Sequence, residues 1–458
     1  MEWDLRILDR DWESLRQHLL RGTSADEEAA FILCGVSVTS KRGILLAREI
    51  LPLPDSAMIA KGGAGITIHP DFIAPIVKRC RIEGLALLQT HSHPFSQDWT
   101  GFSGIDDAGE ARLFPPIQRR APKSVLGALV FGQRSFDGRV WPVESSLSVP
   151  LTTAVVIGDA IQDVRPSSYT HNVAANRHET YDRQLRLIGA EAQKKINNIS
   201  VGIVGLGGTG SHVVQQLSYL GVRNFVIVDP DTVEESNLSR LIGANAEDVG
   251  QPKVSIMTRV LHSQTTSRVK AINGDVYHRS VANNLRDCDL LFCCTDTLTS
   301  RMVLSRMASQ YLLPLIDMGI NIQLASDGTV SRIGGRVMTQ LPGDPCLDCL
   351  GILQPDVLNR ELMSAEERGS NPYVQGAEDE HAPAVVSLNG VVASLAVTEF
   401  LHLVSGRVGD RRSRTFQMYD GVKGTVRLIS LKPERDCGVC DEVRAMGDLI
   451  PLPCLQDR

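Results

Sequence analysis

The chain has 458 residues, with 47 Lys and Arg against 53 Asp and Glu, so its formal net charge is −6. A protein that coats nucleic acid would usually be basic, so this balance argues against a nucleic-acid partner. The content of 43% hydrophobic and 22% charged residues is typical of a globular protein, long enough here for two or three domains. The first residues lack the basic and then apolar pattern of a signal peptide, and we therefore expect a cytoplasmic protein.

Residues 1–150 predict a mixed α+β domain, since strands and helices occur without regular βαβ alternation. We expect helices at 11–20 and 70–80, and strands at 29–38, 43–51, 85–91, 124–132 and 139–143. The polar residues around Pro166 predict a linker at 151–179.

Residues 180–445 predict a second domain with a doubly wound, mostly parallel, Rossmann-like sheet, because strands and helices alternate. The expected strands are 201–205, 225–228, 269–272, 290–294 and 314–317, and the expected helices are 210–220, 253–263 and 301–311. The polar segment 353–383 predicts a long mobile loop, and 446–458 a C-terminal tail. The apolar stretch 384–404 contains Asn389, Glu399 and His402, which favours a core helix over a membrane span.

A glycine-rich turn lies between the first strand and the first helix of this second domain. It contains Gly205, Gly207, Gly208 and Gly210, which would let the backbone approach a phosphate at a helix N-terminus. Asp229 ends the next strand, where an acid that binds ribose is expected. On this motif alone, an NAD-binding fold is an equal alternative.

Further charged residues favour a triphosphate with Mg²⁺ over a dinucleotide. A dense polar run follows Asp229, a lysine opens the next helix, and an acid follows an apolar strand at the end where ligands bind in such sheets. Three cations and one late acid suit ATP and its Mg²⁺, and an NAD oxidoreductase remains a remote alternative. The residues concerned are Arg183, Asp231, Asn237, Arg240, Lys253 and Asp296.

Residues 181–443 resemble the adenylyltransferases that activate ubiquitin-like proteins, a superfamily that includes the ubiquitin-activating enzymes and the bacterial thiamine- and molybdopterin-biosynthesis adenylyltransferases. The matching motifs are the glycine-rich turn, Tyr-x-Arg-Gln at 181–184, Ser-Asn-Leu-x-Arg at 236–240, Gly-x-x-Lys at 250–253 and Cys-Thr-Asp at 294–296. The resemblance implies that a C-terminal glycine carboxylate of a ubiquitin-like partner attacks the α-phosphate of ATP. The products would be an acyl-adenylate and pyrophosphate.

The same resemblance assigns roles to single residues. Asp229 would bind the ribose, the ATP phosphates would contact Asn237, Arg240 and Lys253, and Asp296 would hold Mg²⁺. Arg183 would reach the phosphates of a neighbouring subunit, which implies a homodimer through this domain.

Two Cys-x-x-Cys pairs, Cys346/Cys349 and Cys437/Cys440, predict a structural zinc site with four thiolates and no open position. Two disulfides or redox pairs are the alternative, which fits poorly in a reducing cytosol. Between Cys349 and Cys437 the chain has no cysteine, so a thioester relay in that loop is excluded. Cys454 is the remaining thioester candidate, and an inert tail residue is its other interpretation.

A third group of residues indicates a catalytic zinc. His91 and His93 end an apolar strand and are two residues apart, so both imidazoles face the same way. With Asp106 they would provide three ligands and leave a fourth position for water. Taken singly, Ser103 and Asp106 could be a helix cap, and Glu28 a solvated member of an acidic run.

Together these residues resemble the JAMM metalloisopeptidases, which remove ubiquitin-like proteins and share an upstream Glu, His-x-His-Pro and Ser-x-x-Asp. The resemblance implies that Glu28 is the general base and that Ser103 stabilises the oxyanion. Nine residues separate His93 from Ser103, two more than is usual in that family. This departure leaves Asp98 and Asp107 as alternative ligands to Asp106.

We therefore expect a bifunctional enzyme with one structural and one catalytic Zn²⁺. It would adenylate the C-terminal glycine of a ubiquitin-like protein with ATP and hydrolyse peptide or isopeptide bonds after that glycine. A conjugating enzyme is a further expected partner. The alternatives are activation of a sulfur-carrier protein for cofactor or cysteine biosynthesis, and an N-terminal domain that only docks the substrate.

Overall fold

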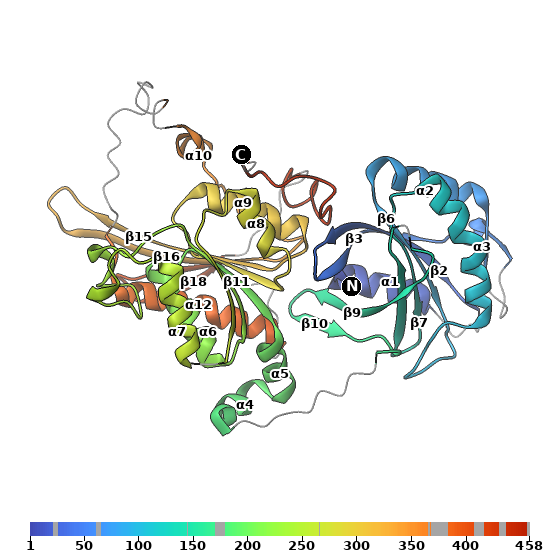
Figure 1. The fold of residues 1–458 in the computed structure, drawn as a ribbon, viewed down its shortest axis with the longest axis horizontal. Coiled ribbons are helices and arrows are strands. Elements are labelled where there is room, and N and C mark those ends of the chain that lie inside the picture. The colour runs from blue at the N-terminus through green and yellow to red at the C-terminus, as the bar shows by residue number, and fades with distance from the viewer. Residues whose placement is uncertain are drawn as a thin grey trace. The chain divides into compact units, whose positions relative to one another are not determined.

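The computed structural model describes residues 1–21, 26–60, 66–143, 145–169, 179–264, 266–364, 367, 383–406, 416–429 and 437–455. The chain forms two compact units (Figure 1). Unit 1 consists of Met1–Ala174, Gln310–Leu312 and Arg444–Pro451, and unit 2 of Ala175–Ser309, Leu313–Val443 and Leu452–Arg458.

Unit 1 is built on an eight-stranded sheet that closes on itself like a barrel. The strand order is β1-β3-β2-β6-β7-β8-β9-β10, and β1 also pairs with β9 in parallel. The strands are β1 (Glu2–Leu8), β2 (Ala29–Val38), β3 (Arg42–Pro52), β6 (Ala86–Ser92), β7 (Leu126–Phe131), β8 (Phe136–Trp141), β9 (Val149–Ile157) and β10 (Ile161–Val164), and a separate pair is formed by β4 (Met58–Ala60) and β5 (Thr67–Ile68).

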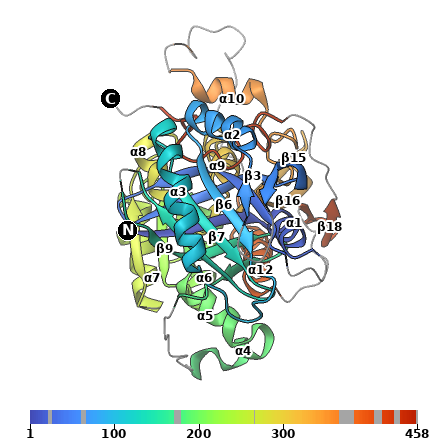
Figure 2. The ribbon, with the colours of Figure 1, turned by 90° about the vertical axis from the view of Figure 1, so that its right-hand side faces the viewer.

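Two apolar cores cover the two faces of this sheet, because successive strand residues point to opposite sides. Ala30, Ile32 and Cys34 of β2 face the core that includes Trp12 of helix α1 (Asp9–Leu19). Phe31 and Leu33 face the other core, together with helices α2 (Pro70–Glu83) and α3 (Gly104–Arg120), which Figure 2 shows beside each other.

The structure differs from the sequence prediction at the boundaries of this unit. Residues 151–164 were expected in the linker, but β9 and β10 place them in the sheet, and residues 170–178 lie outside the described part of the chain. The expected tail 446–458 is also paired in part, since Gly447 bridges Val36 of β2 and Leu455 bridges His278. Residues 456–458 are not among those described.

Unit 2 contains the predicted doubly wound sheet, in the order β13-β12-β11-β14-β15-β16-β17-β18. The first five strands in this order are parallel and the last three are antiparallel. They are β11 (Ser200–Val204), β12 (Asn224–Val228), β13 (Arg268–Ile272), β14 (Leu290–Cys293), β15 (Leu315–Leu324), β16 (Val330–Gln340), β17 (Phe416–Asp420) and β18 (Thr425–Ile429).

The helices of unit 2 include α12 (Val386–Ser405), which packs against β15, β16 and α6. By length and composition α12 could cross a membrane, yet Phe400 and Leu403 are fully buried, and it lies in the unit as the predicted core helix. Helix α10 occupies part of the expected loop 353–383. The other helices are α4 (Asp182–Ile188), α5 (Ala190–Asn198), α6 (Gly208–Leu220), α7 (Lys253–Gln264), α8 (Arg279–Ala282), α9 (Leu298–Gln310) and α10 (Pro355–Leu362), with short 3₁₀ turns at Glu179–Tyr181, Glu235–Asn237, Ala246–Asp248 and Asn283–Leu285. Unit 1 contains a 3₁₀ turn at Asp55–Ala57.

Candidate functional site

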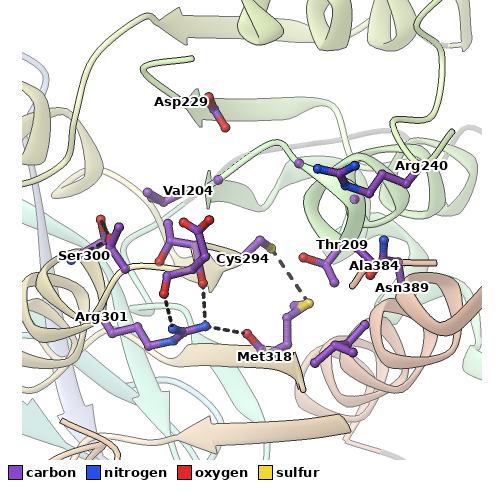
Figure 3. A pocket seen from close by; sticks show the side chains of 18 of the residues that line it. Val204, Thr209, Asp229, Arg240, Cys294, Ser300, Arg301, Met318, Ala384 and Asn389 are labelled. Carbon is purple, nitrogen blue, oxygen red and sulfur yellow. Dashed lines mark hydrogen bonds between the residues drawn. The ribbon is translucent and has the colours of Figure 1, made fainter. Parts of the chain in front are cut away.

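A cavity of about 720 Å³ opens in unit 2 where the parallel strands β11, β12, β14 and β15 end (Figure 3). Parallel strands present their carboxyl ends at one edge, and the loops that follow them meet there. Most of the nucleotide-binding residues predicted from the sequence line this cavity: Gly205, Gly207, Gly208, Asp229, Asp231, Asn237, Arg240, Lys253 and Asp296.

The glycine-rich turn is held tightly between β11 and α6. Gly205 has φ +87°, a conformation that favours glycine, and its N–H donates to Val228 O at 2.9 Å. Gly210 lies behind the turn, where an added Cβ would overlap the carbonyl oxygen of Gly205. The turn can adopt its shape only because these two positions lack side chains, and it leaves the N-terminal N–H groups of α6 pointing at the cavity.

We expect Gly210→Ala to destabilise the nucleotide-free protein by about 1–3 kcal/mol, because a rigid backbone oxygen blocks the added methyl group. Gly207→Ala is the matched control, since nothing lies within 4 Å of a Cβ placed there. Thermal unfolding without nucleotide measures the difference. Equal melting temperatures for the two variants would contradict this account of the turn.

Asp229 connects the turn to the next strand. Its Oδ2 accepts from Leu206 N at 2.6 Å and its Oδ1 accepts from Asp231 N at 2.8 Å. Burial raises the pKa of the Asp229 carboxyl, and the charge of Lys253 partly opposes that effect. Each carboxylate oxygen keeps further lone pairs, so Asp229 can hold the turn and still accept a ribose hydroxyl.

Two of the predicted phosphate-binding cations are positioned by neighbouring groups. Lys253 Nζ lies 2.7 Å from Asp231 Oδ2, so these two candidate residues form an ion pair with each other. Arg240 Nη1 donates to Ser236 O at 2.7 Å. Asn237 is buried and its Nδ2 donates to Ser236 Oγ at 3.1 Å. The cations therefore lie at the cavity wall in fixed directions, where a polyphosphate would meet them.

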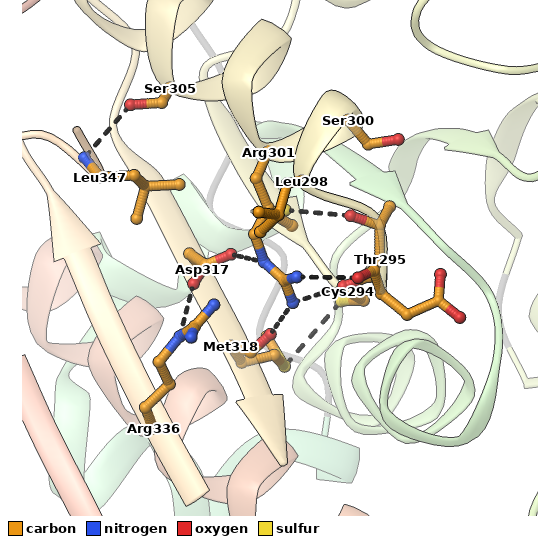
Figure 4. Close-up of polar contacts among 12 residues, drawn as sticks. Cys294, Thr295, Leu298, Ser300, Arg301, Ser305, Asp317, Met318, Arg336 and Leu347 are labelled. Atoms are coloured by element: carbon orange, nitrogen blue, oxygen red, sulfur yellow. Dashed lines mark hydrogen bonds and ion pairs between the residues drawn. The ribbon is translucent and has the colours of Figure 1, made fainter. Parts of the chain in front are cut away.

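Asp296 is exposed at the cavity, in the loop after β14. Arg301, which the sequence interpretation did not single out, holds this loop by hydrogen bonds (Figure 4). Its Nη1 donates to Asp296 O at 3.2 Å, and its Nη2 donates to Thr295 O. A single carboxylate beside a phosphate site is the donor set that Mg²⁺ commonly uses, so Asp296 fits a magnesium ligand.

Asn389 of α12 is a second residue whose role the sequence did not indicate. It is 5% exposed, lines the cavity, and its Nδ2 occupies the space that a Cβ on Gly208 would need. Since Asn389 is about 180 residues from the turn, only the fold brings the two together.

The fold and this cavity define the class of α/β proteins that bind nucleotides at the carboxyl edge of a doubly wound sheet. The sequence model of the ThiF family matches residues 181–439, more than half of the chain, and the chain therefore belongs to the ThiF family.

Three curated proteins illustrate the similarity. The SAMP-activating enzyme E1 of Haloferax volcanii is 26% identical over 279 residues, 60% of this chain and 92% of that protein. The molybdopterin-synthase adenylyltransferase of Escherichia coli is 29% identical over 270 residues, 57% and 96% of the two chains. The sulfur carrier protein adenylyltransferase of Thermus thermophilus is 28% identical over 277 residues, 59% and 94%.

The four cysteines of the two Cys-x-x-Cys pairs converge in unit 2. Their Sγ atoms lie within 4.8 Å of one another, with Cys346 3.7 Å from Cys349 and from Cys437, and Cys349 3.5 Å from Cys440. Four thiolates about 2.3 Å from one tetrahedral zinc would be about 3.8 Å apart, so the cluster fits the metal. All ten cysteines are free thiols, which contradicts the disulfide alternative. Burial raises the pKa of Cys346 to about 12, so the protein alone does not favour thiolates here.

A second cluster lies in unit 1, where β6 ends. The ligand atoms of His91, His93 and Asp106 lie within 4.8 Å of one another. His91 Nε2 is 3.0 Å from Asp106 Oδ1, and His93 Nε2 is 3.5 Å from Asp106 Oδ2. His91 Nε2 is buried, and the Asp106 carboxylate is its polar neighbour. Two imidazole nitrogens and a carboxylate that converge in this way fit a zinc ion.

The alternative ligands point elsewhere. Asp98 binds Arg134 with both oxygens, at 2.7 and 3.0 Å, and Asp107 Oδ1 accepts from Arg139 Nη2 at 2.7 Å. The loop between His93 and Ser103 is two residues longer than is usual in the JAMM family, but Asp106 still lies beside the histidines.

Ser103 and Asp106 also form the helix cap that was the alternative interpretation. Ser103 N donates to Asp106 Oδ2 at 2.6 Å, and Asp106 N donates to Ser103 Oγ at 3.3 Å. Burial raises the pKa of Asp106, but hydrogen bonds from His91 and His93 outweigh it and hold that pKa well below its usual range. The cap orients Asp106 toward the histidines, so the two interpretations are compatible.

The structure corrects the expected position of Glu28. Its carboxylate binds Arg21 Nε and Nη2, both at 3.1 Å, whereas Glu27 Oε1 lies 3.8 Å from His93 Nε2. Neighbouring residues in extended chain point to opposite sides, so a one-residue difference decides which carboxylate faces the cluster. Burial raises the pKa of Glu27, an effect that His91 and His93 partly oppose.

Two further expectations remain predictions. Arg183 is exposed on α4 and is not among the described residues that line the cavity, and its role in a neighbouring subunit stays a prediction. Cys454 is half-buried, with its Sγ 3.9 Å from Val276 O, and its chemistry is untested.

Proposed function

We propose that unit 2 is an ATP-dependent adenylyltransferase that acts on the C-terminal carboxylate of a small sulfur-carrier or ubiquitin-like protein. The observation that supports this proposal most directly is that one cavity is lined by the glycine-rich turn, by Asp229 as the candidate ribose ligand, by two cations and by Asp296. Membership in the ThiF family supports this proposal, as do relatives whose names are those of adenylyltransferases and of an E1 activating enzyme.

The reaction forms one bond and breaks one. A carboxylate oxygen of the terminal glycine attacks the α-phosphorus, and the bond from that phosphorus to the β-phosphate breaks, with the electron pair leaving on pyrophosphate. Lys253 and Arg240 neutralise charge on the phosphates, and the N–H groups at the start of α6 donate to them. Asp296 would hold Mg²⁺, which would supply further positive charge beside the leaving pyrophosphate.

Two fates of the acyl-adenylate distinguish the two classes of partner. Attack on the acyl carbon by a sulfide-level sulfur donor, with AMP leaving, would give a thiocarboxylate. Attack by an amine, with AMP leaving, would give a conjugate, and this route requires a conjugating enzyme. Relatives named for molybdopterin synthase and for a sulfur carrier favour the first fate. A homodimer in which Arg183 reaches the neighbouring nucleotide completes this proposal.

The test is pyrophosphate exchange into ATP with a panel of ubiquitin-like and sulfur-carrier proteins that end in Gly-Gly. Exchange that requires one of these proteins is the expected result. ATP binding without exchange across the panel would argue against this class of substrate. Binding of NAD in preference to ATP would contradict the proposal outright.

A second candidate function belongs to unit 1, because His91, His93 and Asp106 form a three-ligand set beside an acidic residue. We infer that it hydrolyses peptide or isopeptide bonds after the partner's terminal glycine. Zinc, which these three residues would hold, supplies a bound water of lowered pKa. Glu27 would take a proton from the attacking water at Oε1 and return it to the leaving amine. Ser103, which orients Asp106, would stabilise the oxyanion.

We expect Glu27→Gln to reduce this hydrolysis about 100-fold without loss of zinc, because the amide cannot accept the proton. Glu28→Gln is the matched control at the adjacent position and should keep most of the activity, since its carboxylate binds Arg21. The substrate is a Gly-Gly partner with a C-terminal extension. A larger loss for Glu28→Gln than for Glu27→Gln would restore the sequence-based assignment.

Zinc content separates hydrolysis from docking alone. Two zinc ions per chain are expected if both clusters are metal sites. One zinc per chain, with no loss on His91→Ala, would favour an N-terminal unit that only docks the substrate.

A further inference from the structure

Asp317 of β15 joins two arginines at one end of the nucleotide cavity (Figure 4). Its Oδ1 accepts from Arg301 Nε at 3.0 Å and its Oδ2 from Arg336 Nε at 3.2 Å. Asp317 is 1% exposed, so this carboxylate is desolvated and held by both partners. Two guanidinium groups against one carboxylate leave the cluster with one excess positive charge.

The two arginines differ in what else they bind. Arg301 is buried and directs its remaining donors to backbone carbonyls, at Thr295, Asp296 and Met318. This pattern is that of a structural residue. Both arginines line the cavity, but the side chain of Arg336 is 26% exposed, against 8% for Arg301. The excess charge of the cluster is therefore presented to the cavity by Arg336.

Some of the cavity wall beside Arg336 is glycine backbone. A Cβ on Gly319 would lie 3.6 Å from Arg336 Cζ, so the guanidinium lies directly over this backbone. Gly334, on the same strand as Arg336, also lines the cavity, and the nearest atom to a Cβ placed on it would be Arg332 Nε at 3.4 Å. Backbone without side chains leaves room for a narrow extended segment, and a tail that ends in glycine is such a segment.

The strand order places Arg336 on the side of the cavity from which an acyl substrate would approach the nucleotide. Asp229 ends β12, the glycine-rich turn follows β11, Asp296 follows β14, and β15 and β16 come next. If ribose and phosphates occupy the first three positions, the attacking carboxylate must enter from β15 and β16. An anion that approaches ATP is repelled by it, and a fixed cation on that side reduces the repulsion.

We propose that Arg336, held by Asp317, binds the terminal carboxylate of the acyl substrate and directs it at the α-phosphorus. This inference rests on the proposed adenylyltransferase function and identifies the residue that recognises its second substrate. Asp317 and Arg301 are positioning residues, because they fix the guanidinium and do not touch the substrate.

The experiment compares the binding of AMP with that of the sulfamoyl analogue of glycylglycyl-adenylate. In this stable compound the acyl carbonyl oxygen stands for the carboxylate oxygen that does not attack, and this is the atom that Arg336 would bind. Wild-type protein should bind the analogue more tightly than AMP. Arg336→Ala should weaken binding of the analogue about 10- to 100-fold and leave AMP binding unchanged. Arg336→Lys keeps the charge without the planar fork and should lie between them. Arg427→Ala, an exposed arginine of β18, is the matched control.

Equal affinity of wild type and Arg336→Ala for the analogue would overturn the role of Arg336 and leave the proposed function standing. A wild-type protein that binds the analogue no better than AMP would overturn the proposed function itself. A parallel loss of AMP and analogue binding would also contradict the inference, since Arg336 would then support the nucleotide site or the fold.

Discussion

Lys253→Ala is expected to slow partner-dependent pyrophosphate exchange about 1000-fold. The Nζ of Lys253 lies in a fixed position at the cavity wall, 2.7 Å from Asp231 Oδ2, where it can neutralise charge that develops on the phosphates. Removal of one such preorganised group costs roughly two to three orders of magnitude in rate in well-studied enzymes. The measurement is exchange at saturating ATP and partner.

Two controls make this result specific. Lys270→Ala removes an exposed lysine of β13 and should leave exchange unchanged. Because Lys253 is buried and paired, thermal unfolding must show that Lys253→Ala is folded. A folded Lys253→Ala protein with near-normal exchange would remove Lys253 from the phosphate site.

Cys346→Ser is expected to release the structural zinc and to destabilise unit 2 by more than about 4 kcal/mol. Cys346 is fully buried, and its Sγ is 3.7 Å from both Cys349 and Cys437. When a structural metal binds only the folded state, its binding free energy becomes folding free energy. The measurements are zinc content by atomic spectroscopy and unfolding with and without a chelator.

Cys454→Ser provides the comparison, since this cysteine lies outside the four-thiol cluster. It should keep its zinc and its melting temperature. A Cys346→Ser protein with unchanged zinc content, or a wild type whose stability does not respond to chelation, would contradict a structural zinc site.

Much of unit 2 could be predicted because its signals are local. The glycine-rich turn, Asp229 at the end of a strand and Lys253 at the start of a helix each follow from the order of elements in a parallel sheet. The four-cysteine site could also be predicted, because the two-residue spacing within each Cys-x-x-Cys pair lets both of its thiolates bind the same metal ion.

Asn389, Arg301 and the Asp317–Arg336 pair could not be predicted, because their roles depend on contacts between distant segments. In the sequence, Asn389 is only a polar residue within an apolar helix. Its contact with the glycine-rich turn forms because α12 packs against α6. Asp317 is the last residue of a strand expected from the sequence, and the residues near it in the sequence do not indicate that it binds two arginines. A buried polar residue at the end of a predicted strand is the signal that could have suggested it.

The errors in unit 1 have similar physical causes. Glu27 and Glu28 are adjacent, and the segment before β2 has too little periodicity to tell which of them faces inward. The residues of β9 and β10 contain turn-forming and polar positions, so they resembled a linker. Their pairing with β1 and with each other, which closes the sheet, is not visible in any local pattern.

The most direct test of the whole account is pyrophosphate exchange with one Gly-Gly partner and with the same partner lacking its last glycine. The account predicts exchange that depends on the intact partner and is lost when the terminal glycine is removed. Exchange of equal rate with the shortened partner, or without any partner, would contradict a carboxyl-terminal glycine as the group that attacks ATP.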